Sequence, residues 1–212
     1  MSQISLNIYI YIYVILRSAT FLLRHSFCSI HNMSLLTKKE IIHQMKKGSI
    51  IINPFIEDNL GSNSYDLTIG PIVSVYTNEV LQFGNKNANH IDIINITDHG
   101  SIELNPDRVY LFSTNEYVET KDCVGTIHAR SSAARLGIDV ICSGGIGDIG
   151  YGGFWTMAVS VRQRVIIPAM AKIAQMLFHS VRGKITTKYT DKPTAKYQNK
   201  ENMPISSREQ IY

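Results

Sequence analysis

Short runs of β-forming residues, separated by turn signals, occupy most of the sequence between residues 49 and 179, and they constrain its fold more than any other feature. Turn signals recur between the runs, including Asn53-Pro54, Gly61-Ser62-Asn63, Gly70-Pro71 and Asn105-Pro106-Asp107. The expected strands are 49–53, 64–68, 71–77, 91–95, 108–113, 123–129, 138–142, 154–162, 164–168 and 173–179. Because no helices alternate with them, a Rossmann fold is not expected, and the pattern predicts a mainly β domain of the sandwich or barrel kind.

One helix is expected ahead of the strands. Thr37 and Glu40 have the spacing of a capping box, which marks a helix N-terminus. Gly48 is placed to end this helix. Its apolar face consists of Ile41, Ile42 and Met45.

The first 32 residues differ from the rest, because they contain no Asp or Glu and include an alternating Ile-Tyr run that begins at Ile8. The apolar stretch is too short to span a bilayer, whereas an acid-poor leader is compatible with organelle targeting. Alternating Ile and Tyr is also what an alternating A/T dinucleotide repeat encodes, and we favour this origin, with Met33 as the start. The expected organisation is a leader at 1–32, a domain at 33–181 and a polar tail at 182–212.

The net charge of +4 and the charged content of 18% are modest. Without a basic stripe, a small anionic ligand is expected rather than nucleic acid or a membrane. The cysteines, at 28, 123 and 142, lack metal-ligand or disulfide spacing, which favours the cytoplasm or another reducing compartment. The His-x-Glu and Pro-Cys-x-x-Cys motifs of zinc deaminases do not occur, so no zinc is expected.

Arg130-Ser131-Ser132 directly follows the expected strand 123–129. Two hydroxyls and a guanidinium at a strand end supply donors that suit phosphate oxygens. Taken alone, such a triplet is more typical of a solvated loop.

Six glycines lie within the twelve residues from Cys142 to Gly153, together with Asp148 and Tyr151. Glycines allow the backbone to approach a ligand closely. The carboxylate could accept from a sugar hydroxyl or orient a water, with the tyrosine ring against the sugar. The alternative is a flexible hairpin.

The expected strand 154–162 alternates between two faces. One face carries Trp155, Met157, Val159 and Val161, and the other carries Thr156, Ala158, Ser160 and Arg162. The first face is expected in the core, and the polar face could line a pocket, although an ordinary half-buried strand would show the same pattern.

In this order, the features resemble the dCTP deaminases, including the bifunctional dCTP deaminase/dUTPases of the dUTPase-like superfamily. The resemblance extends from about Met33 to the C-terminus. Its segments are Ile50-Ile51-Ile52-Asn53-Pro54-Phe55, Gly61-Ser62-Asn63-Ser64-Tyr65-Asp66-Leu67, Arg130-Ser131-Ser132-Ala133-Ala134-Arg135-Leu136-Gly137, Asp148-Ile149-Gly150-Tyr151, Ala174-Gln175-Met176-Leu177-Phe178, Tyr189 and Ala195-Lys196-Tyr197-Gln198-Asn199. Each segment is modest alone, but the ordered set is specific.

The resemblance implies a distorted β-barrel or jelly-roll-like domain of the dUTPase type. It also implies a homotrimer with active sites between subunits, which binds dCTP or dUTP with Mg²⁺ carried by the triphosphate. Asp148 would bind the deoxyribose 3′-hydroxyl and activate the attacking water. Tyr189 and Lys196 would close the tail over the triphosphate as a lid. The implied catalytic residues are Asp148, Ser131 and Arg135, and the implied nucleotide-binding residues are Arg130, Ser131, Ser132, Tyr151, Gln175, Tyr189 and Lys196.

Ala158 is the main departure from this family. It stands where dCTP deaminases have the Glu that serves as general base and acid at C4 of cytosine, and general acid–base catalysis contributes roughly 10²–10⁴-fold. We therefore expect deamination to be nearly abolished and favour a dUTPase-like diphosphatase, which needs Asp148 and not the Glu. The alternatives are an active dCTP deaminase and a non-catalytic nucleotide-binding or regulatory relative. Arg135, which holds that Glu in the family, is retained without its partner.

Overall fold

Helix α2 (Lys38–Lys46) begins at the predicted capping site and ends two residues before the predicted glycine. The Thr37 hydroxyl accepts a hydrogen bond from the Glu40 backbone N–H at 3.4 Å. Gly48 has a φ of +72°, a conformation that favours glycine after a helix.

The computed structural model describes residues 34–77, 80–81, 91–140, 145–193, 195, 197 and 201–204. The expectations for the leader at 1–32 and for Met33 as the start therefore lie outside the described residues.

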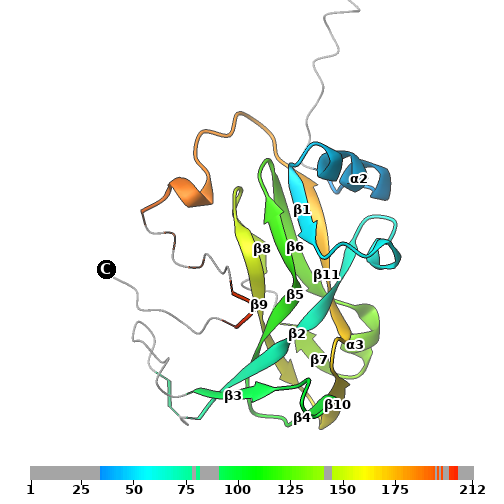
Figure 1. The fold of residues 1–212 in the computed structure, drawn as a ribbon, viewed down its shortest axis with the longest axis vertical. Coiled ribbons are helices and arrows are strands. Elements are labelled where there is room, and N and C mark those ends of the chain that lie inside the picture. Colours follow the sequence, from blue (N-terminus) through cyan, green and yellow to red (C-terminus); the bar gives the residue numbers. More distant parts are fainter. Residues whose placement is uncertain are drawn as a thin grey trace, which may run out of the picture. The chain divides into compact units, whose positions relative to one another are not determined.

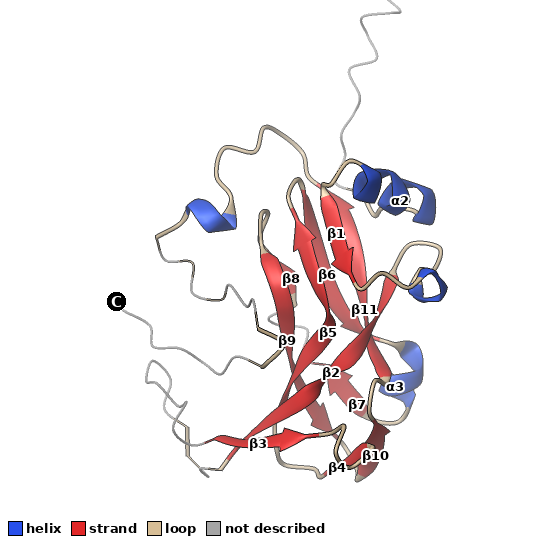
Figure 2. Ribbon diagram, viewed as in Figure 1, coloured by secondary structure: helices blue, strands red, loops and turns tan. Residues whose placement is uncertain are grey.

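A curled antiparallel sheet dominates the described residues (Figures 1 and 2). Its strand order is β7-β9-β5-β2-β11-β6-β8, with β1 on β5 and β3 on β2, while β10 and β4 form a separate pair. The strands are β1 (Ile50–Asn53), β2 (Tyr65–Tyr76), β3 (Ile91–Asn95), β4 (Ser101–Leu104), β5 (Tyr110–Thr120), β6 (Cys123–Ala129), β7 (Ile138–Val140), β8 (Ile146–Gly147), β9 (Gly152–Val161), β10 (Val165–Pro168) and β11 (Lys172–Ser180). The short helices are α3 (Ser131–Arg135), η1 (Glu57–Asn59) and η3 (Tyr189–Asp191). The expected mainly β fold is confirmed.

The predicted turn at Gly70-Pro71 is wrong, because β2 runs through both residues as one long strand. Its pairing with β5 shifts register between Ile69 and Val73. A shift at this point accommodates the proline, which has no N–H to donate to a ladder. Strands β4 and β8 and helix α3 were not predicted.

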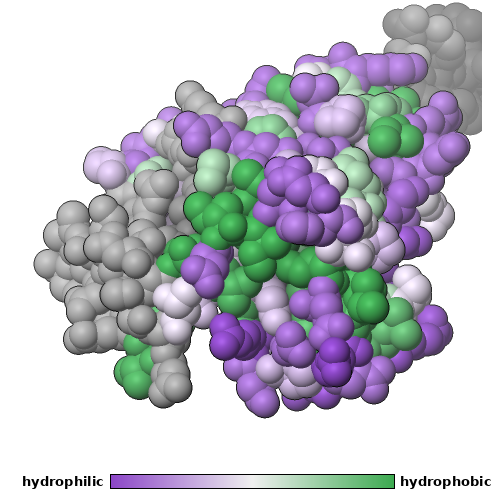
Figure 3. Space-filling model, turned by 60° about the horizontal axis from the view of Figure 1, so that its bottom comes forward, coloured by the Kyte–Doolittle hydropathy of each residue, from purple (hydrophilic) through white to green (hydrophobic). Residues whose placement is uncertain are grey.

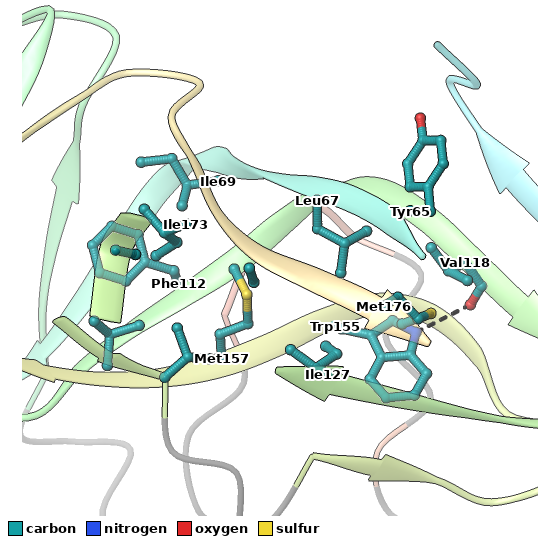
Figure 4. Close-up of a cluster of buried hydrophobic side chains, with 14 of the residues drawn as sticks. Tyr65, Leu67, Ile69, Phe112, Val118, Ile127, Trp155, Met157, Ile173 and Met176 are labelled. Carbon is teal, nitrogen blue, oxygen red and sulfur yellow. Dashed lines mark hydrogen bonds between the residues drawn. The ribbon is translucent and has the colours of Figure 1, made fainter. Parts of the chain in front are cut away.

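The core lies on the inner face of the curled sheet. Strand β9 alternates as expected, with Trp155, Met157 and Val159 buried and Ala158 on the half-buried opposite face. The Trp155 indole Nε1 donates to the Val118 carbonyl at 3.3 Å, so its polar atom is satisfied within the core. Figure 4 shows Trp155 and Met157 among side chains from β2, β5, β6 and β11.

Some large apolar side chains remain on the surface. Ile93 is 60% exposed and Ile166 is 65% exposed, and Figure 3 shows hydrophobic residues gathered on one face between polar regions. In the described part of the chain, no helix has the length and apolar character needed to cross a bilayer.

Candidate functional site

Arg130 stands at the junction between β6 and α3, as the N-cap of that helix. Its Nη2 lies 3.1 Å from Asp66 Oδ2, and its Nη1 donates to the Lys172 carbonyl at 3.2 Å. The backbone N–H of Arg130 donates to the Ile173 carbonyl at 2.9 Å. The guanidinium is therefore held from two sides, and its remaining N–H groups can donate to an anion.

The strand register explains why Asp66 meets Arg130. Gln175 on β11 pairs with Asp66 on β2 and with His128 on β6, so these three residues form one row across the sheet. Directly paired residues of antiparallel strands share a face. Gln175 thus lies beside the Asp66–Arg130 pair, and its role in binding the nucleotide stays a prediction.

Three further predicted residues, Ser131, Ser132 and Arg135, are exposed on α3 just beyond Arg130. The two hydroxyls and two guanidinium groups form a cluster of hydrogen-bond donors with a positive charge. This chemistry suits phosphate oxygens.

Glu116 on β5 is a fully buried carboxyl group that sequence reasoning missed. It accepts hydrogen bonds from the Thr68 backbone N–H at 3.0 Å and from the Thr68 hydroxyl at 2.7 Å. Burial raises the pKa of Glu116, and the hydrogen bonds from Thr68 oppose that rise. Because Thr68 is two residues from Asp66, Glu116 fixes the strand that carries the partner of Arg130.

Asp148 lies in the turn between β8 and β9. Its Oδ2 accepts from Lys192 Nζ at 2.8 Å, and both side chains are about half exposed, at 50% and 45%. Gly150 has a φ of +82°, and a Cβ there would come within 2.7 Å of Lys188 Cβ. The turn therefore requires glycine for its conformation and for the close approach of the tail.

Tyr151 and Tyr189 meet beside this turn. Their ring centroids are 5.5 Å apart in an edge-to-face arrangement, and Tyr151 also packs edge-on against Trp155 at 4.9 Å. Burial raises the pKa of Tyr151, as do the neighbouring Tyr189 and Tyr117, so its hydroxyl stays neutral. The Tyr189 backbone N–H donates to the Ile149 carbonyl at 2.7 Å, which docks the start of the tail on the turn.

The structure does not bring the Arg130 group and the Asp148 group together within one chain. Gly147 pairs with Gly125 near the start of β6, whereas Arg130 follows the end of that strand. Asp148 thus lies opposite residue 124, and six residues at about 3.3 Å each place it roughly 20 Å from Arg130 along β6. Figure 1 shows α3 and the orange segment that contains η3 on different sides of the sheet.

Ala158 lies towards the Arg130 end of the sheet rather than towards the Asp148 turn. It pairs with Leu111 on β5, and the next residue, Val159, pairs with Val140 on β7, the strand that follows α3. Glu116 lies five residues further along β5 than Leu111 and accepts hydrogen bonds from Thr68, so it does not supply the carboxylate that the resemblance leads us to expect at position 158. Lys196, the remaining predicted residue, lies outside the described residues.

Comparison with known proteins identifies the family. The family model for dCTP deaminase-like proteins matches residues 35–181. The chain belongs to this dCTP deaminase-like family. A "dCTP deaminase, dUMP-forming" from Clostridium beijerinckii is 33% identical over 172 residues, covering 81% of this chain and 95% of the relative. One of the same name from Hathewaya histolytica is 36% identical over 165 residues, covering 78% of this chain and 91% of the relative.

Among solved structures, the 2′-deoxycytidine 5′-triphosphate deaminase from Agrobacterium tumefaciens matches with a TM-score of 0.57 and 16% identity. The match covers 70% of this chain and 48% of that chain, so this protein spans about half the length of the solved one. The likeness confirms that the chain has the fold of this family.

Proposed function

We propose that this member of the dCTP deaminase-like family hydrolyses dUTP to dUMP and pyrophosphate and has little capacity to deaminate dCTP. The observation that carries the proposal is Ala158, on the half-buried polar face of β9, in a chain that keeps the Asp148 turn and the Arg130 cluster. A methyl group cannot move protons at the cytosine base, whereas an exposed carboxylate can still orient a water.

The names of the relatives agree with two separable reactions. Conversion of dCTP to dUMP exchanges the amino group of the base for a carbonyl and also removes two phosphates. A "dUMP-forming" deaminase therefore breaks a C–N bond and a phosphoanhydride bond. Loss of the group that serves the first step leaves the second step chemically intact.

In the proposed reaction, Asp148 takes a proton from a water whose oxygen attacks the α-phosphorus. The bond from the α-phosphorus to the bridging oxygen breaks, and pyrophosphate leaves. Arg130, Ser131 and Ser132 donate to the phosphate oxygens and stabilise their charge. In the described part of the chain, no group of three His, Cys, Asp or Glu side chains could hold a metal. We propose that Mg²⁺ is carried by the triphosphate, where it would neutralise phosphate charge.

We further propose that each site combines the Arg130 cluster of one copy with the Asp148 turn of another, in a homotrimer. A single ribose ring links the 3′-hydroxyl of a nucleotide to its α-phosphate. One nucleotide therefore cannot contact both ends of β6, which are roughly 20 Å apart. The apolar surface in Figure 3 supports contact between copies.

Product analysis tests the reaction. Purified protein with Mg²⁺ is incubated separately with dUTP and dCTP, and nucleotides and pyrophosphate are measured. Release of dUMP and pyrophosphate from dUTP, with no uracil nucleotide from dCTP, is the expected result. Rapid formation of dUMP from dCTP would instead show that this protein both deaminates the base and removes pyrophosphate, as the name of the relatives implies for them. No turnover of either substrate would leave a nucleotide-binding or regulatory role.

Mixed oligomers test the shared site. Arg130→Ala and Asp148→Asn are each expected to be inactive, but co-expression should restore activity, because about a quarter of the sites combine two intact halves. No recovery in co-purified mixed oligomers would place both halves in one chain.

A further inference from the structure

We infer that Lys192 and Asp148 act together as a donor–acceptor pair that recognises the 3′-hydroxyl of the deoxyribose. This assigns Lys192 as a specificity-determining residue. The inference rests on the proposed binding of a deoxynucleotide at this turn, but it does not require hydrolysis.

The geometry of the pair supports recognition of a hydroxyl group. Lys192 Nζ donates to only one carboxylate oxygen, Oδ2, at 2.8 Å. Among the described residues no other side chain donates to Asp148, so Oδ1 remains available to accept. The ammonium has three donors. An alcohol can therefore donate its proton to Asp148 and accept from Lys192 at the same time.

The charge of the pair decides which ligand group it suits. Asp148 and Lys192 neutralise each other, so the pair itself offers no excess positive charge to a phosphate. The Arg130 cluster, with the exposed Arg135, has that excess. A neutral group with one donor and one acceptor is the best partner for the Asp148–Lys192 pair, and the 3′-hydroxyl is the sole free hydroxyl of a deoxynucleotide sugar.

The position of Lys192 is fixed by its own segment. The Lys192 backbone N–H donates to the Tyr189 carbonyl at 3.1 Å, and the Tyr189 N–H donates to the Ile149 carbonyl at 2.7 Å. The Asp191 carboxylate caps the segment by accepting from the Lys188 N–H at 2.8 Å. The ammonium thus reaches Asp148, which precedes Tyr151 by three residues, and the Tyr151 ring could pack against a sugar.

The same segment provides a matched control. Lys188 also forms an exposed ion pair, with Asp122, at 3.5 Å. Lys188→Met removes a cation from the same segment without touching Asp148. Lys192→Met removes the donor of the proposed pair, and Lys192→Arg keeps a donor.

The test measures binding, by calorimetry, of the α,β-imido analogues of dUTP and 2′,3′-dideoxy-UTP, which are not hydrolysed between these phosphates. The wild type should bind the deoxy analogue more tightly than the dideoxy one. Lys192→Met should weaken binding of the deoxy analogue by about tenfold and of the dideoxy analogue by less than about twofold, since a hydrogen bond from a charged donor is lost only where the hydroxyl exists. Lys192→Arg should recover most of the loss, and Lys188→Met should leave the ratio of the two affinities unchanged.

Other outcomes are equally informative. An equal loss for both analogues would overturn the inference and give Lys192 a purely structural role. Tighter binding in Lys192→Met would also overturn it and make the ion pair a competitor of the nucleotide. A Lys192-dependent ratio in a protein that releases no pyrophosphate would uphold the inference while the proposed hydrolysis fails. Failure to bind either analogue would overturn both.

Discussion

The two ends of β6 carry the two halves of the candidate site, and they are built in different ways. At the Arg130 end, the important side chains stand on paired strands, with Asp66 and Gln175 in register and Glu116 buried behind them. At the Asp148 end, a turn is completed by the tail through one backbone hydrogen bond, the edge-to-face contact of Tyr189 with Tyr151 and exposed ion pairs. Exposed ion pairs contribute little stability, about 0–1 kcal/mol. The Arg130 end is therefore preorganised, whereas the Asp148 end depends on docking of residues 188–192.

Asp148→Asn should have the largest effect, and it separates catalysis from nucleotide binding at the Asp148 end. The amide keeps an oxygen acceptor but cannot take a proton. We expect pyrophosphate release from dUTP to fall by roughly 10²–10⁴-fold, while affinity for the α,β-imido analogue falls by less than about tenfold. Asp122→Asn, which alters another exposed carboxylate facing the tail, is the control and should leave turnover unchanged. An equal fall in binding and turnover would contradict a role as general base.

Ala158→Glu tests the preorganised end by adding back a proton-transfer group. If the strands hold the rest of the site in place, the variant should convert the base of dCTP to uracil about 10²-fold faster than the wild type. Chromatography of the products measures the change. Ser160→Glu places the same charge two residues along the same face of β9 and should produce no gain. Equal rates in the two variants would contradict the assigned register.

Substitutions of Glu116 test how far the stability of the Arg130 end depends on a buried carboxyl group. Glu116→Leu would leave the Thr68 N–H and hydroxyl without their acceptor, at a cost of about 2–3 kcal/mol in the free energy of unfolding. Glu116→Gln keeps an acceptor and should be tolerated. Urea unfolding provides the measurement.

The pH dependence of the same residue is a second readout. Burial raises the pKa of Glu116 in the folded protein above its ordinary value of 4.5. As pH rises from about 4.5 towards the raised value, the unfolded chain loses this proton first, so the contribution of Glu116 to stability decreases. Glu116→Gln lacks this decrease, and its stability relative to the wild type should rise with pH. A difference that does not change between pH 4 and 7 would refute the assignment.

The sequence predicts what depends on local periodicity and misses what depends on strand order. The mainly β fold, the start of α2 and the two faces of β9 follow from patterns within a few residues of each other. The partner of Arg130 is 64 positions away at Asp66, and Thr68 and Glu116 are separated by 48. Such pairs form only once β2, β5, β6 and β11 have taken their places.

The separation of Arg130 from Asp148 has the same origin. The motif order along the chain places these residues close in sequence, but the pairing of Gly147 with Gly125 directs them to opposite ends of one strand. The sequence does not single out Lys192, because the polar tail contains several lysines and has no periodicity that distinguishes one of them.

Asp66→Asn is expected to have the smallest effect and tests the strand-built end most finely. The variant keeps the bond from Arg130 to the Lys172 carbonyl but loses the ion pair, so the guanidinium is less firmly oriented. We expect the KM for dUTP to rise by about fivefold, equivalent to about 1 kcal/mol, with kcat nearly unchanged. Asp66→Glu should recover part of the loss. Because Asp66 and Arg130 are only 20% and 34% exposed, salt should weaken their effect less than that of Lys192, which is 45% exposed. Equal salt sensitivity of the two effects would show that the two ends of β6 do not differ in preorganisation.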